Sequence, residues 1–508
     1  MNKKSEEKIR LRFAPSPTGS FHIGSARTAL FNYLYAQKKK GVLVLRIEDT
    51  DRERSKKIYE EDIMRSLSWL GMTWEEGVFE DEERGDYGPY RQSERGDIYK
   101  RYLMKMIEEE RAYYCFCSKE ELEKEREESE KNKIAHKYSG TCRNLPIKEQ
   151  NKRIKDGERY VIRIRLPENE IIKFDDQIRG SVSFSSGELG GDFVIGKENF
   201  FPLYNFACVV DDYEMKITHV IRGEDHISNT PKQIAIQQAL GIEIPEYAHL
   251  PLILGNDKSK LSKRHGSVSL FEYKEKGYLP EALINFISFL GWNPGGEREI
   301  YSKEEIIEKF SFSRCQKSGA VFNIDKLTSI NGYYIRNMEL EKLTEIVVPY
   351  LISEKLITKK GEGEYYAPQR DEDINFRKIK DIISLYQERI KLLSEVPLLT
   401  DYFFIKKLDY DPKLLLWKEA SPEDTIRQLQ NCISLVESIK KWDLETIKEA
   451  LIREADKNDN KGVFLWPARV ALSGKKASAG PFEIIWVMGP EMTIERLRMA
   501  IESLKGIK

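Results

Sequence analysis

Two segments, far apart in the chain, carry side chains that suit chemistry on a polyphosphate. The first is the turn from Arg12 to Ser25, in which prolines and a glycine precede His22 and Gly24. These two residues stand where a helical pattern begins, and the free N–H groups of a helix N-terminus favour a phosphate. Gly24 would let a nucleotide approach the backbone, and His22 would donate to a phosphate oxygen. Taken alone, the triplet His22-Ile23-Gly24 is equally typical of a turn that happens to contain a histidine.

The second segment, Lys260 to Gly266, places Lys260, Lys263 and Arg264 in a loop that also contains serine and glycine. Such a loop can close over a polyphosphate and stabilise the charge that develops during in-line transfer. A solvated surface loop is the simpler interpretation of this segment alone. The order and wide separation of the two segments are more informative than either segment by itself.

The two segments resemble the signatures of class I aminoacyl-tRNA synthetases, a His-Ile-Gly-His-type motif and a Lys-Met-Ser-Lys-Ser-type loop. The variants found here have Ser25 in place of the second histidine and Leu261 in place of methionine, and they resemble the glutamyl branch. Further segments similar to this branch follow in the family's order at 12–19, 47–51, 204–212 and 221–231. Catalysis in this class rests mainly on positioning and charge stabilisation, so Ser25 is compatible with activity.

The resemblance implies a bacterial-type glutamyl-tRNA synthetase, a cytoplasmic glutamate–tRNA ligase that is expected to be a monomer. It implies that ATP with Mg²⁺ activates L-glutamate to glutamyl-adenylate, and that the glutamyl group passes to the 3′-terminal adenosine of tRNA(Glu). Whether tRNA(Gln) is charged as well stays open. A catalytically silent tRNA-binding relative is the alternative. The joint presence of Arg12, His22, Arg222 and Lys263 argues against it.

Glutamate has two carboxylates and one ammonium group, so its pocket should contain arginines and an acid. By the resemblance, the glutamate-binding residues are Arg12, Ala14, Ser16, Glu48, Tyr204, Cys208 and Arg222. An arginine fork binds a carboxylate through two hydrogen bonds, whereas Glu48 would receive the ammonium group. A buried Arg222 without a carboxylate partner would be costly, which favours glutamate over glutamine. Each residue taken singly is equally typical of an ordinary ion pair or a polar strand end.

The resemblance also assigns the nucleotide side of the site. The ATP-binding residues are expected to be His22, Gly24, Asp225, Leu261 and Lys263. The catalytic residues are expected to be His22, Gly24, Lys260 and Lys263. The sequence contains no P-loop, no dinucleotide fingerprint and no Ser-His-Asp arrangement, which removes the main competing enzyme classes.

Three of the six cysteines, Cys115, Cys117 and Cys142, have a spacing that suits a structural zinc ion and requires a fourth ligand. His136 and Tyr138 are the candidates within reach. Some glutamyl-tRNA synthetases carry a Cys-x-Cys…Tyr-x-x-x-Cys zinc site in the insertion that binds the tRNA acceptor end, and this resemblance favours Tyr138. Thiols that are merely buried or reactive are the alternative.

These residues need a scaffold that brings the ends of several strands together. Residues 9–13, 24–40 and 41–47 read as strand, helix and strand, and the nearly continuous apolar character of the last segment predicts a parallel sheet covered on both faces. The expected fold is α/β: a Rossmann-like class I synthetase catalytic domain with an α+β insertion, followed by an all-α anticodon-binding half. Ligands of such sheets lie at the carboxyl ends of the strands.

The expected domain boundaries follow changes in the local pattern. They are 1–112 and 204–255 for the two halves of the catalytic domain, 113–203 for the acceptor-binding insertion, 256–330 for a stem-contact region, and 331–508 for an all-helical anticodon-binding domain. Residues 119–133 predict a solvated helix, and no strand-rich segment is expected beyond 275. Basic and aromatic residues interleave at Arg377–Lys380 and Trp466–Arg469, which suits stacking on anticodon bases.

Length and composition limit the number of domains, the class of protein and the cellular location that can be expected. At 508 residues the chain is too long for one core, and 40% hydrophobic with 33% charged residues indicate a soluble, globular protein. The first residues do not read as a secretory signal, no apolar run is long enough to span a bilayer, and cysteines are few, so a reducing, cytoplasmic location is expected. The net charge of −1 does not decide whether RNA is bound, because a large enzyme can separate its basic and acidic faces.

Overall fold

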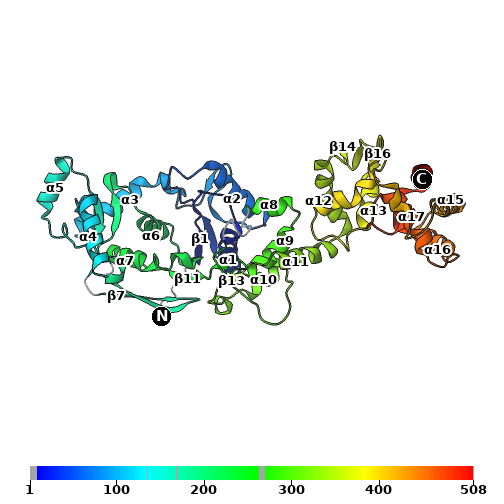
Figure 1. The fold of residues 1–508 in the computed structure, drawn as a ribbon. Helices are drawn as coiled ribbons and strands as arrows, with labels where there is room; N and C mark the ends of the chain where they lie inside the picture. The colour runs from blue at the N-terminus through cyan, green and yellow to red at the C-terminus, as the bar shows by residue number, and fades with distance from the viewer. Residues whose placement is uncertain (1–7, 134–135, 168–169, 262–268, 507–508) are drawn as a thin grey trace. The chain divides into compact units, whose positions relative to one another are not determined.

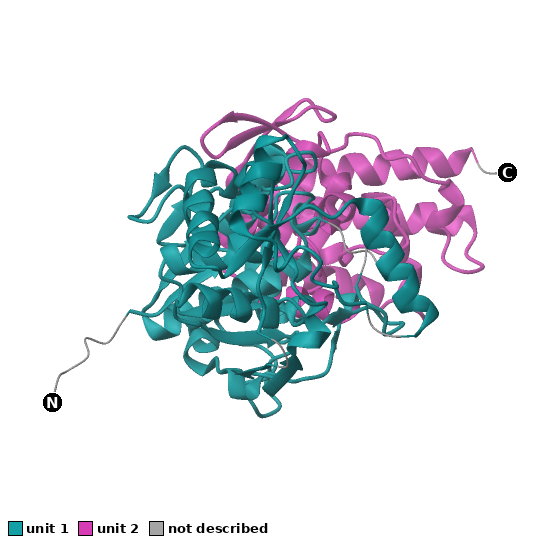
Figure 2. Cartoon of the chain, turned by 90° about the vertical axis from the view of Figure 1, so that its left-hand side faces the viewer, with its two compact units in different colours: residues 1–273, 280–324 teal, residues 274–279, 325–508 magenta. Residues whose placement is uncertain are grey.

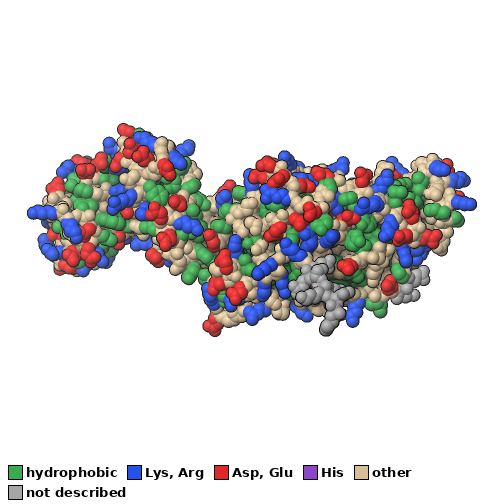
Figure 3. All heavy atoms as spheres, turned by 180° about the vertical axis from the view of Figure 1, so that it is seen from behind, with side chains coloured by type: hydrophobic (Ala, Val, Ile, Leu, Met, Phe, Trp, Pro, Cys, Tyr) green, Lys and Arg blue, Asp and Glu red, His purple; other side chains and the backbone are tan. Residues whose placement is uncertain are grey.

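The computed structural model describes residues 8–133, 136–167, 170–261 and 269–506 (Figure 1). The chain divides into two compact units, one formed by 1–273 with 280–324 and the other by 274–279 with 325–508 (Figure 2). In the described ranges, no helix has both the length and the apolar composition that a membrane crossing requires. Acidic and basic side chains are interspersed over the surface shown in Figure 3, in keeping with the net charge of −1.

A sheet of eight strands organises the first unit, in the order β4-β3-β2-β1-β10-β11-β7-β8. Its central strands are parallel neighbours: β2 (Val42–Leu45), β1 (Arg10–Phe13), β10 (His219–Gly223) and β11 (Glu246–Leu250). Its edges are β3 (Glu76–Val78) with β4 (Glu83–Arg84), and β7 (Ile171–Asp176) with β8 (Gly180–Ser185). The carboxyl ends of the parallel strands therefore meet at one edge, where a ligand is expected.

The strand–helix–strand unit predicted at the N-terminus is confirmed. Helix α1 (Ile23–Lys39) joins β1 to β2, and every residue of both strands is buried. The helix buries Ala26, Leu30 and Leu34 on one side, as the helical spacing of these residues predicts. Helices α9 (Pro280–Ser288) and α10 (Lys303–Lys309) pack against α1.

Strands from the predicted insertion divide between two sheets. β5 (Ala112–Cys115), β6 (Val161–Ile164) and β9 (Val194–Lys197) form an antiparallel sheet of their own. The β7–β8 hairpin instead joins the main sheet, because β7 pairs in parallel with β11. The segment 113–203 thus contributes directly to the sheet that carries the candidate site. Helix α4 (Lys119–Lys131) has no buried residue, which confirms the predicted solvated helix.

Further elements of the first unit connect these strands. Its other helices include α2 (Lys57–Trp69), α3 (Gly96–Glu108), α5 (Ile147–Lys155), α6 (Tyr204–Glu214) and α7 (Thr230–Leu240). A short 3₁₀ turn, η4 (Glu224–His226), follows β10 directly. Two short strands, β12 (Ile253–Leu254) and β13 (Ala320–Val321), pair in parallel. Helix α8 (Leu270–Glu275) leads from the first unit into the second.

Helices dominate the second unit, as expected. They include α11 (Ile324–Arg336), α12 (Leu340–Ser353), α13 (Phe376–Ser384), α14 (Glu395–Thr400), α15 (Pro422–Ser438), α16 (Leu444–Ala455), α17 (Gly462–Ser473), α18 (Pro481–Met488) and α19 (Pro490–Lys505). Helices α15, α17 and α19 pack against one another and bury Leu429, Phe464 and Leu497. An apolar core of this kind, rather than intrinsic helix propensity, supplies most of the stability of such helices.

The expectation that no strand-rich segment lies beyond residue 275 is wrong. β14 (Thr358–Gly361), β15 (Glu364–Ala367) and β16 (Glu372–Asn375) form a three-stranded antiparallel sheet (Figure 1). β14 has no buried residue, so the segment lacks the apolar alternation from which strands are predicted. Gly363, with a φ of 70°, forms the tight turn between β14 and β15.

Candidate active site

The first signature caps the helix that follows β1. His22 is the N-cap residue of α1, and its Nδ1 accepts a hydrogen bond from the backbone amide of Ser25 at 3.3 Å. A Cβ atom at position 24 would lie 3.0 Å from His22 Cε1, so Gly24 leaves room for the imidazole ring. The imidazole therefore lies against the N-terminus of α1, where a phosphate is favoured. Ser25, the departure from the usual motif, takes part in the cap through its backbone.

Residues that follow the second signature contact the first signature in the structure. Ser269 forms a β-bridge with His22, and the amide of Leu270 donates to the carbonyl of Phe21 at 2.8 Å. The chain that leaves the basic loop is thus joined through its backbone to the start of α1. This neighbourhood is what a shared nucleotide site requires.

The start of the basic loop is held next to Asp225. Lys260 Nζ lies 2.8 Å from Asp225 Oδ1, and the two side chains are 62% and 47% exposed. An ion pair this exposed contributes little to stability, so Lys260 can exchange it for a contact with a ligand. The amide of Leu261 donates to the carbonyl of Ile253 at 2.8 Å. Lys263 lies outside the described residues.

Three predicted glutamate-binding residues come from neighbouring strands. Arg12 lies in β1, Glu48 follows β2, and Arg222 lies in β10. All three are buried. Because β2, β1 and β10 are parallel neighbours, these residues gather at one edge of the sheet, as the sequence analysis predicts.

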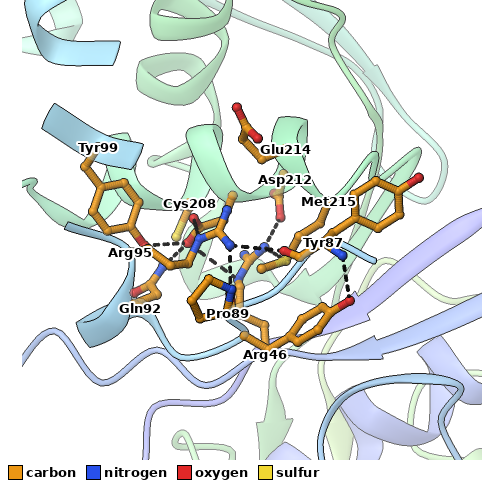
Figure 4. A network of polar contacts seen from close by, with 12 residues as sticks. Arg46, Tyr87, Pro89, Gln92, Arg95, Tyr99, Cys208, Asp212, Glu214 and Met215 are labelled. Carbon is orange, nitrogen blue, oxygen red and sulfur yellow. Dashed lines mark hydrogen bonds and ion pairs between the residues drawn. The ribbon is translucent and has the colours of Figure 1, made fainter. Parts of the chain in front are cut away.

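A buried cluster joins Arg12, Glu48 and Cys208. Arg46 Nη1 donates to Asp212 Oδ1 at 2.7 Å (Figure 4), and Arg46 Nη2 donates to Glu48 Oε1 at 3.1 Å. Arg12 Nε donates to the same Asp212 oxygen at 3.1 Å. Cys208 Sγ donates to the same Glu48 oxygen at 3.3 Å. The cluster therefore orients Glu48 as a hydrogen-bonded carboxylate close to Arg12.

Opposite charges outweigh burial for Arg46 and Asp212. Burial opposes the charge of Arg46, but Asp212, Glu48 and Asp211 raise its pKa well above the usual value. Burial would raise the pKa of Asp212, yet Arg12 and Arg46 lower it. Asp212 and Arg46 are therefore both ionised at neutral pH, and each holds the other in its charged form.

Asp211 extends the network away from the pocket. Its carboxylate accepts hydrogen bonds from three donors that Figure 4 labels: Arg95 Nε at 2.6 Å, Gln92 Nε2 at 2.8 Å and the Tyr99 hydroxyl at 2.9 Å. Tyr99 lies in α3 and Asp211 in α6, so these bonds fix one helix to the other. No role was predicted for Arg46, Asp211 and Asp212 from the sequence. The available signal was a charged residue inside or beside an otherwise apolar run.

Arg222 is held from two sides. Its Nε donates to His249 Nε2 at 3.2 Å, and its Nη2 donates to Thr230 Oγ1 at 2.7 Å. Its guanidinium carbon lies 5.5 Å from the centre of the Tyr247 ring. Arg222 is 6% exposed, so an anion bound to it would be screened by little water, which strengthens the attraction.

Tyr204 begins α6 and reaches His226. Its hydroxyl lies 3.2 Å from His226 Nδ1. Burial foremost, and then the charge of Arg222, lower the pKa of His226 to about 4. The ring is therefore neutral near pH 7. Tyr204 is 37% exposed, which leaves its ring accessible to a ligand.

Ala14 and Ser16 lie in the loop that follows β1. The amide of Glu48 donates to the carbonyl of Pro15 at 3.0 Å, and the amide of Thr18 donates to the carbonyl of Ser16 at 2.9 Å. The backbone bond from Glu48 joins this loop to the buried cluster. Ser16 is exposed and Ala14 is partly exposed, so both are accessible from solvent.

Comparison with known proteins agrees with this geometry. Residues 8–329 match the family described as tRNA synthetases class I (E and Q), catalytic domain, and residues 342–501 match an anticodon binding domain. A glutamate–tRNA ligase of Carboxydothermus hydrogenoformans is 44% identical over 495 residues, which cover 96% of this chain and 99% of the relative. Glutamate–tRNA ligase 2 of Caldicellulosiruptor saccharolyticus is 42% identical over 495 residues, which cover 97% of this chain and 99% of the relative. The chain belongs to the glutamate–tRNA ligase family.

A solved structure supports the same assignment. The crystal structure of a glutamate tRNA ligase from Elizabethkingia meningosepticum, in complex with its amino acid, superposes with a TM-score of 0.85 at 34% identity. The match covers 98% of this chain and 100% of the chain in the crystal structure. Membership of the glutamate–tRNA ligase family confirms the resemblance drawn from the two signatures. It also confirms the predicted class I fold with a helical anticodon-binding half, and an ATP-dependent aminoacyl-tRNA ligase as the enzyme class.

The predicted metal ligands of this family member form one compact group. The Sγ atoms of Cys115, Cys117 and Cys142 lie within 4.8 Å of one another. The Tyr138 hydroxyl oxygen lies 3.3 Å from Cys115 Sγ and 3.4 Å from Cys117 Sγ. Ligands arranged tetrahedrally around zinc lie about 3.5–3.8 Å apart, so these four side chains fit the ion. His136, the other candidate for the fourth ligand, is exposed and lies outside the metal-ligand group found among the described residues.

Surrounding groups prepare this cluster for a cation. The pKa of Cys115 is lowered to about 4, chiefly by the hydrogen bond from the Cys142 thiol and also by the hydrogen bond from the Tyr138 hydroxyl. The amide of Cys142 donates to the Tyr138 hydroxyl oxygen at 3.1 Å. The guanidinium carbon of Arg163 lies 3.8 Å from the centre of the Tyr138 ring, a cation–π contact that orients the phenol. These contacts hold the four candidate ligands in place together.

Proposed function

We propose that the chain loads L-glutamate onto tRNA(Glu) in two steps within one site. The observation that carries the proposal is the gathering of Arg12, Glu48 and Arg222 at the carboxyl ends of β1, β2 and β10, where β1 leads into the capped helix α1. This edge of the sheet offers arginines for carboxylates, an acid for an ammonium group and a helix N-terminus for a phosphate. Free glutamate and ATP together present these groups.

In the first step, the α-carboxylate of glutamate attacks the α-phosphate of ATP, which gives glutamyl-adenylate and releases pyrophosphate. Arg222 binds the side-chain carboxylate and Glu48 receives the ammonium group. Arg12, Ala14, Ser16, Tyr204 and Cys208 complete the glutamate pocket. A glutamine amide in the same place would leave the charge of Arg222 without an anionic partner, which is costly at a buried site.

The nucleotide lies between the two signatures in this proposal. His22 donates to a phosphate oxygen at the N-terminus of α1, and Gly24 lets the nucleotide approach the backbone. Lys260 exchanges Asp225 for a phosphate, and Lys263 joins it in stabilising the charge that develops during transfer. Asp225 and Leu261 line the nucleotide. Mg²⁺ accompanies ATP and neutralises charge on the phosphate oxygens.

In the second step, the 2′-hydroxyl of the terminal adenosine of the tRNA attacks the carbonyl carbon of the adenylate. The new ester forms, the bond to the phosphate breaks, and AMP leaves. The helical second unit binds the anticodon of the same tRNA. Interleaved basic and aromatic side chains of this unit suit stacking on unpaired bases.

Cys115, Cys117, Tyr138 and Cys142 hold a structural zinc ion in this proposal. Bound there, the ion would join the end of β5, which carries Cys115, to the segment that carries Tyr138 and Cys142. It lies in the insertion that binds the acceptor end of the tRNA and takes no part in the chemistry. The chain acts as a cytoplasmic monomer.

The test is ATP-dependent loading of labelled glutamate onto separate transcripts of tRNA(Glu) and tRNA(Gln), with fully modified tRNA in parallel. Loading of tRNA(Glu) alone identifies a discriminating enzyme. Loading of both identifies one whose product on tRNA(Gln) needs later amidation. Loading of neither by folded protein contradicts the proposal.

A further inference from the structure

Arg222 and His249 are direct cross-strand partners in the main sheet. The parallel pairing of β10 with β11 places Arg222 opposite His249, and the pairing of β11 with β7 places Tyr247 opposite Asp176. His249 lies two residues after Tyr247 and so shares its face of the sheet. Three strands thus bring Asp176, His249 and Arg222 into one row, although they are far apart in sequence.

The hydrogen bonds along this row have a definite direction. Asp176 Oδ2 lies 2.7 Å from His249 Nδ1 and accepts the His249 amide at 3.0 Å. Asp176 Oδ1 accepts the amides of Ile178 at 2.9 Å and Arg179 at 2.7 Å. A carboxylate can only accept, so Nδ1 carries the hydrogen of the imidazole. His249 Nε2 is therefore the acceptor nitrogen of the ring, to which Arg222 Nε donates at 3.2 Å, and the Thr230 hydroxyl oxygen lies 3.0 Å from the same nitrogen.

Burial and charge keep the row in this state. Asp176 is 4% exposed and His249 is 0% exposed. Burial opposes ionisation of Asp176, but the bonds from His249 and the backbone amides lower its pKa. Burial foremost lowers the pKa of His249. The imidazole is therefore neutral near pH 7, and Arg222 carries the only positive charge of the three.

The geometry points to Asp176 and His249 as positioning residues for glutamate specificity, which act by fixing the guanidinium of Arg222. The inference rests on the proposed glutamate site, in which Arg222 binds the side-chain carboxylate. His249 holds Nε and Thr230 holds Nη2, and within the described part of the chain no hydrogen bond engages Nη1. The guanidinium is thereby turned so that its Nη1 end remains for the ligand.

This assignment gives the β7–β8 hairpin a part in substrate selection. Asp176 is the last residue of β7, in the segment that the sequence analysis assigned to a separate insertion. The hairpin supplies the carboxylate that sets the tautomer of His249. Without the Asp176 carboxylate, the His249 ring can carry its hydrogen on Nε2, and Nε2 can then no longer accept a hydrogen bond from Arg222. A neutral group at position 176 should therefore weaken glutamate binding without touching the ligand.

The decisive variant is His249→Phe in the full-length chain, which keeps a ring but removes the acceptor for Arg222. The KM for glutamate in aminoacylation, at saturating ATP and tRNA(Glu), should rise about 10- to 100-fold, the loss expected for a hydrogen bond to a charged group. The KM for ATP should not change. The ratio of kcat/KM for glutamate over glutamine should fall. His249→Gln, which returns an acceptor, should recover part of the loss.

Ile172→Val is the matched control. Ile172 lies in the same strand as Asp176, is 1% exposed, and makes no contribution to the row. This variant should lower the melting temperature slightly and leave both the KM for glutamate and the glutamate–glutamine ratio as in the wild type. A merely structural role for His249 predicts instead that His249→Phe behaves like this control.

Asp176→Asn tests whether the carboxylate acts through His249. Alone it should raise the KM for glutamate in the same direction as His249→Phe. In the His249→Phe background it should add no further rise, because the residue through which it acts is already gone. Additive effects on the KM for glutamate would overturn the relay.

Arg222→Gln separates this inference from the proposed function. A large rise in the KM for glutamate with Arg222→Gln, together with a wild-type value for His249→Phe, would overturn the positioning role and leave the glutamate site intact. A wild-type value for Arg222→Gln would overturn the glutamate site itself. A large rise with both variants supports both.

Discussion

Arg46 and Asp212 form a buried, hydrogen-bonded ion pair beneath the proposed glutamate pocket, with Nη1 and Oδ1 2.7 Å apart. Arg46 also binds Glu48, and Asp212 also binds Arg12. Two residues that would touch glutamate are thus positioned by two that lie behind them. Burial without such a network would favour neutral forms of these groups.

Loss of Arg46 should destabilise the first unit strongly. Arg46→Leu leaves Asp212, Asp211 and Glu48 buried without their shared cation, a change that typically costs about 3–5 kcal/mol. Chemical denaturation measures the loss. Arg54→Leu is the matched control, because its partner Asp51 and Arg54 itself are 40% and 75% exposed, and such pairs contribute about 0–1 kcal/mol. Equal effects of the two substitutions would contradict the buried network.

Lys263→Ala should slow adenylate formation about 10²- to 10³-fold, the range observed when one charge-stabilising donor is removed. Lys260→Ala should also slow adenylate formation, with no loss of stability, since the ion pair of Lys260 with Asp225 is exposed. Pyrophosphate exchange in the presence of tRNA(Glu) is the measurement, and Lys276→Ala, an exposed lysine elsewhere, is the control. Unchanged exchange in Lys263→Ala would remove that residue from the proposed clamp.

The chain should bind one zinc ion through Cys115, Cys117, Tyr138 and Cys142. Elemental analysis of the purified protein should show it, and Cys142→Ser should abolish it. Tyr138→Phe should weaken retention of the ion against a chelator while keeping the fold. Cys315→Ser, at a cysteine outside this cluster, should retain full occupancy. Equal retention of zinc by Tyr138→Phe and the wild type would exclude the phenol as the fourth ligand.

Stability should fall as the pH falls from about 6.5 to about 4, in part because of His226. Burial and Arg222 lower its folded-state pKa from 6.5 to about 4. Within this window the unfolded chain binds a proton at His226 that the folded chain does not, so the free energy of unfolding decreases with decreasing pH. Denaturation at pH 7 and pH 5 should show a smaller decrease for His226→Asn than for the wild type. Identical decreases would show that His226 is not the group responsible.

Local patterns were sufficient to predict the first strand–helix–strand unit and the two signatures. Apolar runs predict the strands β1 and β2, and helical spacing predicts α1, because the side chains of these elements are buried in a regular pattern. The strands β14–β16 escaped prediction because β14 and β16 contain no buried residue, and the alternation of the four-residue β15 is too short to be recognised alone. Element type was therefore predictable where burial is regular, and not where it is absent.

Strand order was the information that the sequence pattern lacked. His249 and Asp176 meet only because β7 pairs with β11, a contact between segments that local periodicity cannot connect. The same holds for Arg46 and Asp212, which read as charges beside apolar runs until the sheet and α6 bring them together. The candidate substrate-binding residues were named from the family resemblance and stay a prediction, whereas the residues packed behind them, such as Arg46 and Asp212, were found only in the three-dimensional structure.

The most direct test of the account is amino-acid selectivity in tRNA(Glu) charging. We would measure kcat/KM for glutamate and for glutamine with the wild type and with Arg222→Ala. We expect the wild type to prefer glutamate strongly and Arg222→Ala to lose most of that preference, with the KM for ATP unchanged. A wild-type enzyme that charges glutamine equally well, or an Arg222→Ala variant that keeps the full preference, would contradict this expectation.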